Sequence, residues 1–200
     1  MRNVVEDRDG WATVANQPHF KDPHIEVATV EVRSPARHVP HRWTVVHRKA
    51  AVVIAPLTAE GKLILVKQER IPIRAAIWEM PAGQIDGEWP LDSSEIEEVA
   101  LREMREEIGY ELAPGGELIP LGYFFSSAGF TDEHAYLFLA RTVQPAAGGA
   151  EHDESESIIE SRGFSADELK RMIATNEICD ANTLAVYARL VARGLIDGGI

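Results

Sequence analysis

Three glutamates in one short stretch are the residues of this sequence best placed to do chemistry. Glu103, Glu106 and Glu107 fall within five consecutive positions. Because Glu103 and Glu107 are four residues apart, a helix would put them on one face, with Glu106 beside them. Carboxylates this close repel one another and weaken an isolated helix. A hard divalent cation would offset that repulsion, since Mg²⁺ takes oxygen ligands and is commonly shared with the phosphates of a substrate.

The segment around these acids is predicted to be a helix over residues 95–108. Ser94 and Glu97 can form a capping box at its start, and Pro90 excludes a helix that begins much earlier. Gly109 can supply the C-terminal stop. Apolar residues at helical spacing give the helix a second face that can pack on a sheet: Ile96, Val99, Ala100, Met104 and Ile108.

Composition narrows the possible classes of protein. A chain of 200 residues, 45% of them hydrophobic, suffices for one domain with a real core, with or without a small appendage. No apolar run reaches membrane-spanning length, and the N-terminus lacks the apolar region of a signal peptide. The net charge of −12 argues against nonspecific binding to nucleic acid or to an anionic membrane, but not against a phosphorylated substrate.

Cysteine and histidine usage points to a cytoplasmic protein without a zinc site. The single cysteine, Cys179, excludes an internal disulfide, and we expect it to be a buried apolar residue. The seven histidines show no close ligand spacing.

The first 48 residues are predicted to form a small β layer, ahead of a main domain over residues 49–200. Residues 25–32 alternate between apolar and polar, and residues 43–47 would return as a second strand. Such a layer is too small to stand alone, so it should pack against the main domain or a second subunit.

The main domain is predicted to be a mixed sheet between helices, an α/β/α arrangement. The last helix should be capped by Asp180 or Asn182, and residues 144–156 resemble a surface loop. The apolar face of this last helix would hold Leu184, Tyr187, Ala188 and Val191. Strands are expected at 50–55, 63–70, 118–125, 135–140 and 157–164, followed by helices at 165–175 and about 182–195.

The glutamate-rich stretch resembles the second half of the Nudix box, G-x5-E-x7-R-E-U-x-E-E-x-G-U, in which U is a bulky apolar residue. The matching residues are Arg102, Glu103, Met104, Glu106, Glu107, Gly109 and Tyr110, preceded by Pro81, Ala82 and Gly83. The front half departs from the box, because 13 residues rather than seven separate Glu88 from Arg102. This spacing indicates a six-residue insertion. The first box glutamate could therefore be Glu88, Glu95 or Glu98, and Glu98 could also hold Arg102.

Further stretches are similar to the ADP-ribose pyrophosphatase subfamily of the Nudix hydrolases. They are residues 11–27, 66–70 (V-x-Q-x-R), 78–83 (W-E-L-P-A-G), 127–133 (S-P-G-F-x-D-E, with Ala128 in place of proline) and 180–184 (D-A-x-T-L). The resemblance implies a Nudix α/β/α sandwich with a small N-terminal β layer. It also implies a homodimer, because this layer commonly joins two subunits in the subfamily, sometimes by exchange.

The implied reaction is attack of water on the diphosphate of a nucleoside diphosphate sugar, with Mg²⁺ or Mn²⁺ as cofactor. ADP-ribose would give AMP and ribose 5-phosphate. The resemblance assigns the metal to the Ala82 carbonyl, Glu103 and Glu107. Glu133 would position or deprotonate the water, or bind a metal; a solvated loop acid is the alternative for it. Glu106 could join the metal ligands, and Arg102 would orient the acids.

The expected substrate contacts are Arg70, Trp78, Gly129 and Phe130. Arg70 would hold the diphosphate by charge-assisted hydrogen bonds. A surface ion pair is the alternative for Arg70, and a place in the core is the alternative for Trp78.

Two other functions stay open at this point. The box does not contact base or sugar, so the small-molecule partner could be another nucleotide, such as GDP-mannose, another sugar nucleotide, a dinucleoside polyphosphate or an oxidised nucleotide. The chain could also be a Nudix-fold ligand sensor without catalysis. Such sensors often lose box glutamates, and the presence of Glu103, Glu106 and Glu107 favours an enzyme.

Overall fold

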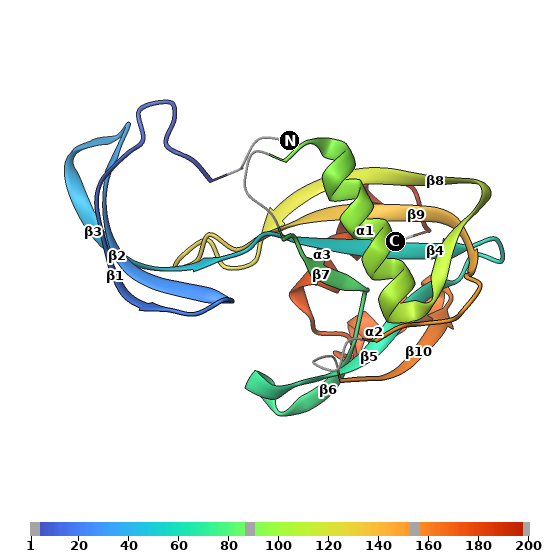
Figure 1. The fold of residues 1–200 in the computed structure, drawn as a ribbon. Coiled ribbons are helices and arrows are strands. Elements are labelled where there is room, and N and C mark those ends of the chain that lie inside the picture. The colour runs from blue at the N-terminus through green and yellow to red at the C-terminus, as the bar shows by residue number, and fades with distance from the viewer. Residues whose placement is uncertain (1–4, 87–90, 153–156, 198–200) are drawn as a thin grey trace.

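The computed structural model, described for residues 5–86, 91–152 and 157–197, contains two sheets of unequal size (Figure 1). Strands β1 (Ala12–Lys21), β2 (Ile25–Ser34) and β3 (Arg37–Arg48) form an antiparallel sheet in that order. This N-terminal sheet stands to one side of the main domain in Figure 1. It contains both predicted strands of the N-terminal layer.

The larger sheet is mixed. Its strands are ordered β10-β5-β4-β9-β8, with β6 on β5 and β7 on β4. Strands β4 and β9 run parallel, and the other pairs are antiparallel. The strands are β4 (Ala51–Thr58), β5 (Leu63–Arg70), β6 (Ala75–Glu79), β7 (Ala82–Gln84), β8 (Tyr110–Phe125), β9 (His134–Pro145) and β10 (Ile158–Phe164); the short 3-10 helix η1 (Ile71–Ile73) precedes β6.

Helices cover both faces of this sheet (Figure 1). Helix α1 (Ser93–Ile108) packs on one face, and α2 (Ala166–Ala174) and α3 (Ala181–Ala192) pack on the other. Successive side chains of a strand point to opposite faces, so Ile54 joins the core with Met104 of α1, while Val53 joins the core with Leu190 of α3. The predicted α/β/α sandwich is therefore confirmed.

The start of α1 differs from the prediction. Asp92, not Ser94, is the N-cap, because its carboxylate accepts the Glu95 N–H while the Glu95 carboxylate accepts the Asp92 N–H. The helix therefore begins at Ser93, and the Glu95 side chain is engaged in the cap. Glu98 is exposed on α1, and Glu88 lies outside the described residues. Gly109 ends the helix in a left-handed conformation, as predicted.

Strand β8 and helix α3 also differ from the predictions. β8 begins at Tyr110, because it absorbs residues 114–116 as an irregularity in its pairing with β9. α3 ends at Ala192, and its buried residues are Thr183, Val186 and Leu190. The predicted apolar face is right in part, because Leu184 and Tyr187 pack against the core, whereas Ala188 is exposed. The Thr183 hydroxyl is turned inward and accepts the Met80 N–H at 2.8 Å.

The expected surface loop over 144–156 is partly tied down. The Glu151 N–H donates to the carbonyl of Glu106, and the His152 side chain contacts the carbonyl of Glu107. These contacts satisfy carbonyls that the last turn of α1 leaves without helical partners.

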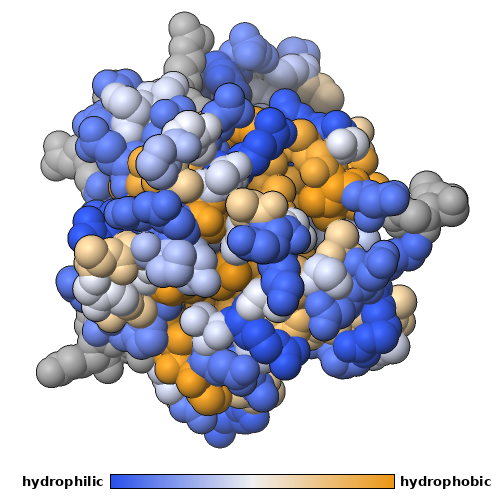
Figure 2. Space-filling view, turned by 90° about the vertical axis from the view of Figure 1, so that its right-hand side faces the viewer, coloured by the Kyte–Doolittle hydropathy of each residue, from blue (hydrophilic) through white to orange (hydrophobic). Residues whose placement is uncertain are grey.

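The side of the molecule that faces away from the N-terminal sheet is shown in Figure 2. Hydrophobic patches on it are bordered by hydrophilic side chains, as on most folded surfaces. None of the helices in the described ranges is long and apolar enough to cross a membrane.

Candidate active site

Two of the box glutamates are buried where α1 meets β7. Glu103 is 6% exposed and Glu107 is 2% exposed. Glu107 Oε2 accepts the N–H of Ala82 at 2.9 Å. The Glu103 carboxylate packs against Gly83 so closely that a Cβ at this position would lie 2.0 Å from Glu103 Cδ. We call Ala82, Gly83, Glu103 and Glu107 the carboxylate corner; the glycine is a steric requirement of this corner.

Arg102 and Glu106 flank the carboxylate corner. Arg102 Nη2 donates to Glu103 Oε1 at 2.8 Å, and Arg102 Nε lies 3.6 Å from Glu106 Oε2. The hydrogen bond to Glu103 is the main reason that the pKa of Arg102 is raised above its usual value. Among the described residues, Glu98 is not an ion-pair partner of Arg102. Within the described part of α1, the ion pairs of Arg102 are with Glu103 and Glu106, and Asp86 adds a smaller electrostatic contribution.

The donor atoms of the corner suit a hard divalent cation. In an antiparallel pair, the N–H and C=O of one residue point to the same side of the strand. The Ala82 N–H donates to Glu107, so the Ala82 carbonyl is also directed away from β4 and toward α1. No three acidic, histidine or cysteine side chains within the described ranges could hold a metal by themselves. The corner does offer carboxylate and carbonyl oxygens, the ligands that hard divalent cations take, and such a cation commonly completes its shell with water and substrate phosphate.

Arg70, at the end of β5, is held by Glu79 at the end of β6. Arg70 Nε donates to Glu79 Oε1 at 2.8 Å and Nη2 donates to Oε2 at 2.6 Å. This bond to Glu79 is the largest of the causes that raise the pKa of Arg70, with smaller contributions from Asp180 and Glu107. Glu79 is only 2% exposed, and the sequence reasoning gave it no role. In the sequence, the signal for Glu79 is an acidic residue within the otherwise apolar stretch 75–80. In the structure, this stretch forms β6 and pairs with β5.

An open cavity of about 640 Å³ connects these parts. Its lining includes Arg70, Glu79, Ala82, Gly83 and Glu133, whereas Glu103 and Glu107 are not part of it. Cys179 is exposed and also lies on its wall, so the expectation of a buried cysteine was wrong. Three of the predicted site residues and one missed acid therefore face one space.

The structure places the other predicted substrate contacts away from this cavity. Trp78 packs edge-to-face on Phe164, with ring centroids 4.9 Å apart, and Arg162 lies over its ring. The carbonyls of Gly129 and Phe130 accept hydrogen bonds from β3. None of Trp78, Gly129 and Phe130 is among the described residues that line the cavity.

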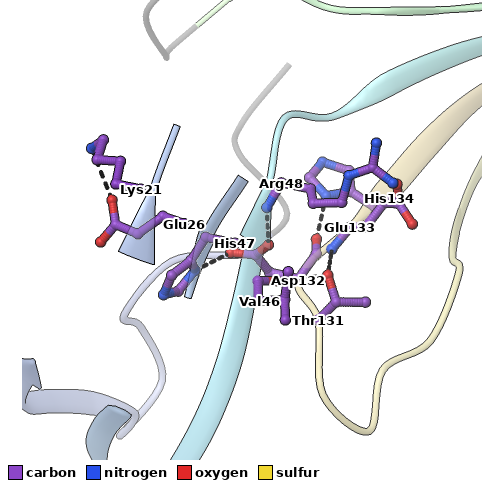
Figure 3. Close-up of polar contacts among 9 residues, drawn as sticks. All are labelled: Lys21, Glu26, Val46, His47, Arg48, Thr131, Asp132, Glu133 and His134. Carbon is purple, nitrogen blue, oxygen red and sulfur yellow. Dashed lines mark hydrogen bonds and ion pairs between the residues drawn. The ribbon is translucent and has the colours of Figure 1, made fainter. Parts of the chain in front are cut away.

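Glu133 is positioned by two residues that the sequence reasoning did not single out. Ser126 Oγ donates to Glu133 Oε2 at 2.6 Å, and Arg48 Nη1 lies 2.6 Å from Oε1. Figure 3 shows Arg48 of β3 beside Glu133 and its neighbour Asp132. No local signal could reveal Arg48, because it is 85 residues away from Glu133 in the chain.

Comparisons with known proteins agree on a family. Residues 46–186 match the model of the NUDIX domain. The chain is 34% identical over 172 residues to the ADP-ribose pyrophosphatase of Bacillus subtilis (strain 168), covering 86% of this chain and 87% of that protein. It is 33% identical over 175 residues to the methanol dehydrogenase activator of Bacillus methanolicus, covering 86% and 88%.

The chain is also similar to a third relative and to a solved structure. The ADP-ribose pyrophosphatase of Mycobacterium tuberculosis (strain ATCC 25618 / H37Rv) is 29% identical over 163 residues, covering 79% of this chain and 74% of that protein. A crystal structure of an ADP compounds hydrolase superposes with a TM-score of 0.72 at 17% identity, covering 96% of this chain and 100% of that one. At this identity, the superposition supports the fold.

Proposed function

The chain belongs to the Nudix family, as a pyrophosphohydrolase, and we propose that its substrate is ADP-ribose, cleaved by water to AMP and ribose 5-phosphate. The relatives from Bacillus subtilis and Mycobacterium tuberculosis that are named ADP-ribose pyrophosphatases support this choice. So do the subfamily-like stretches outside the Nudix box. Nudix hydrolases generally use divalent cations, and we propose Mg²⁺ or Mn²⁺ here.

One observation carries the proposal: a buried carboxylate pair adjoins a cavity that also holds a fixed arginine and a second acid. Ala82 and Gly83, which contact Glu107 and Glu103, line the same cavity as Arg70 and Glu133. Phosphoryl chemistry depends on neutralising charge and on placing water in line with the leaving group. The arrangement offers groups for both tasks.

The arginine is suited to hold the diphosphate. Glu79 accepts from Nε and Nη2 of Arg70, which leaves Nη1 to donate to a phosphate oxygen. Because the pair with Glu79 fixes the guanidinium plane, little side-chain entropy is lost when the phosphate binds.

Glu133 is suited to act on the attacking water. Ser126 and Arg48 fix its two oxygens at the cavity wall, where a carboxylate can orient a water molecule and accept its proton. Glu103 and Glu107, with the Ala82 carbonyl, would hold the cation, with Glu106 nearby. When bound, the cation neutralises charge on the diphosphate.

We also propose that the protein is a homodimer joined through the N-terminal sheet. Ala28 and Val30 are the buried residues of this sheet within the described chain, whereas several large hydrophobic residues are more than half exposed. Examples are Phe20, Val39 and Trp43, and Trp11, directly before β1, is also more than half exposed. Burying such a surface against a second copy would stabilise the assembly.

Molar mass in solution tests the dimer. Phe20→Glu should shift the protein from dimer to monomer in light scattering after size exclusion. Ile159→Glu, a matched change at a residue that is 57% exposed on β10, should leave the dimer intact. A wild-type monomer at micromolar concentration would refute this part of the proposal.

Hydrolysis of a nucleotide panel tests the substrate. The purified protein would be incubated with Mg²⁺ or Mn²⁺ and ADP-ribose, GDP-mannose, UDP-glucose, NADH, a diadenosine polyphosphate or an oxidised dGTP, and the products separated by chromatography. We expect the highest kcat/KM for ADP-ribose, with AMP as product. A strong preference for another nucleotide would keep the family chemistry and refute the substrate, whereas no turnover at all would favour a ligand sensor.

A further inference from the structure

We propose that the end of strand β3 is a clamp that sets the position of Glu133, and that Asp132 is the positioning residue at its centre. The clamp consists of residues 43–48 of β3 and residues 126–133, which we call the Glu133 loop. The catalytic consequence rests on the proposed role of Glu133 in the hydrolysis. The clamp itself rests only on the contacts described next.

The first contacts join β3 to the backbone of the loop. The Val46 N–H donates to the Phe130 carbonyl at 2.9 Å, and the Thr131 hydroxyl donates to the Val46 carbonyl at 2.7 Å. Trp43 Nε1 donates to the Gly129 carbonyl at 2.9 Å. The loop is therefore paired with β3 like a short additional strand, and Val46 and Thr131 form a parallel bridge.

The second contacts converge on Asp132. Its Oδ1 accepts the Arg48 N–H at 3.0 Å, and its Oδ2 lies 2.5 Å from Nδ1 of His47 (Figure 3). The side chain of the same Arg48 pairs with Glu133. Two consecutive residues of β3 thus hold two consecutive acids of the loop.

These contacts matter because the tip of the loop buries little apolar surface. Bonds within the loop also order it: the Ser126 N–H donates to the Glu133 carbonyl at 3.2 Å, and the Glu133 N–H donates to the Thr131 hydroxyl at 3.1 Å. Ser127, Ala128, Gly129 and Phe130 are all exposed, and Phe130 is 53% exposed despite its size. Segments with few buried apolar contacts open at low free energy. The pairing of Phe125 with His134 frames the loop at its base, and the hydrogen bonds to β3 tie its tip and Asp132 to another element. A displacement of about 1 Å in such a group can lower a rate about a hundredfold.

The test compares Asp132→Ala with a matched carboxylate removal on β2, the strand that pairs with β3. Glu31→Ala removes an ion pair to Arg42 that links β2 to β3 without touching the loop. Asp132→Ala should lower kcat about ten- to hundredfold, with KM changed less than threefold, and should speed amide hydrogen exchange in residues 126–133. Glu31→Ala should change neither kcat nor the hydrogen exchange of the loop. Asp132→Asn keeps an acceptor for the Arg48 N–H, so its kcat should be higher than that of Asp132→Ala.

A double-mutant cycle separates positioning from general damage. If Asp132 acts through Glu133, Asp132→Asn should lower kcat no further in a Glu133→Gln background. Additive losses, or unchanged exchange in the loop of Asp132→Ala, would overturn the positioning role while leaving the proposed function intact. Full activity of Glu133→Gln would instead refute the role of Glu133 in the proposed function, and the positioning role with it.

Discussion

The carboxylate corner and the Glu133 loop border the same cavity but are built in opposite ways. In the corner, Glu103 and Glu107 are buried, and the hydrogen bonds described for their carboxylates join positions at most 25 residues apart. In the loop, Glu133 is half-buried, and its contacts to β3 join residues about 85 positions apart. Burial restrains the corner, whereas the loop is held by its own hydrogen bonds and by those to β3 of the N-terminal sheet. The two regions should therefore respond differently to ligands and to substitution.

Removal of divalent cations should have the largest effect. With a chelator in excess, we expect no measurable turnover of ADP-ribose, because the acids of the corner would then repel the diphosphate. Added Mg²⁺ or Mn²⁺ should restore it. The cation should also slow hydrogen exchange in α1 and β7 more than in the Glu133 loop, as measured by mass spectrometry. Full activity in the chelator would contradict the metal assignment.

Glu107→Gln should be the most damaging single substitution of the corner. The amide can still accept the Ala82 N–H, so the fold should persist, but the charge is lost. We expect kcat to fall on the order of 10²–10³-fold, the effect of removing one preorganised electrostatic group. Glu98→Gln, at an exposed position of the same helix, is the control and should keep full activity in a steady-state assay.

Replacement of a glycine by alanine should have a large effect in the corner and a small effect in the Glu133 loop. A Cβ at Gly83 would collide with Glu103, whereas a Cβ at Gly129 would meet no atom within 4 Å. Gly83→Ala should therefore lower the free energy of unfolding by about 1–3 kcal/mol and reduce kcat. Gly129→Ala should leave stability and kcat nearly unchanged. Chemical denaturation would measure the free energy of unfolding of both variants, and steady-state kinetics would measure their kcat. Equal losses in the two variants would contradict the expected difference between the regions.

The smallest effect is expected from Ser126→Ala in the Glu133 loop. It removes one of two hydrogen bonds to Glu133 and leaves the pair with Arg48. We expect kcat to fall only a few-fold, and stability to change by about 1 kcal/mol or less, since the site is open to water. A loss of kcat as large as that of Glu107→Gln would show that activity is as sensitive to changes in the loop as to changes in the corner.

Much of the fold could be predicted because the relevant signals are local. Helical spacing placed Glu103 and Glu107 on one face of α1, and alternating or continuous apolar runs located β2, β4, β5 and β9. The family could be identified from the box for the same reason, since its residues are close together in the chain. The six-residue insertion that the spacing predicts does not change these distances, because it would lie ahead of Arg102 in the chain.

The N-cap of α1 and the inward face of α3 could not be determined from the sequence, because more than one residue could fill each role. Asp92 and Ser94 could each cap α1, and the structure uses Asp92. The inward face of α3 includes Thr183, because the Met80 N–H needs an acceptor in the core. Burial of an unpaired backbone group is unfavourable, so this hydrogen bond outweighs the apolar pattern.

Tertiary structure alone decided the surroundings of the reactive groups. The sequence determined that three glutamates share a helix, but not that Gly83 would press on Glu103 or that Glu79 would hold Arg70. It could not show that Arg48 and His47 meet Glu133 and Asp132, because strands bring such residues together only when two distant segments pair. Local spacing determines which face a residue occupies, whereas the partner that it meets there depends on the packing of the whole chain.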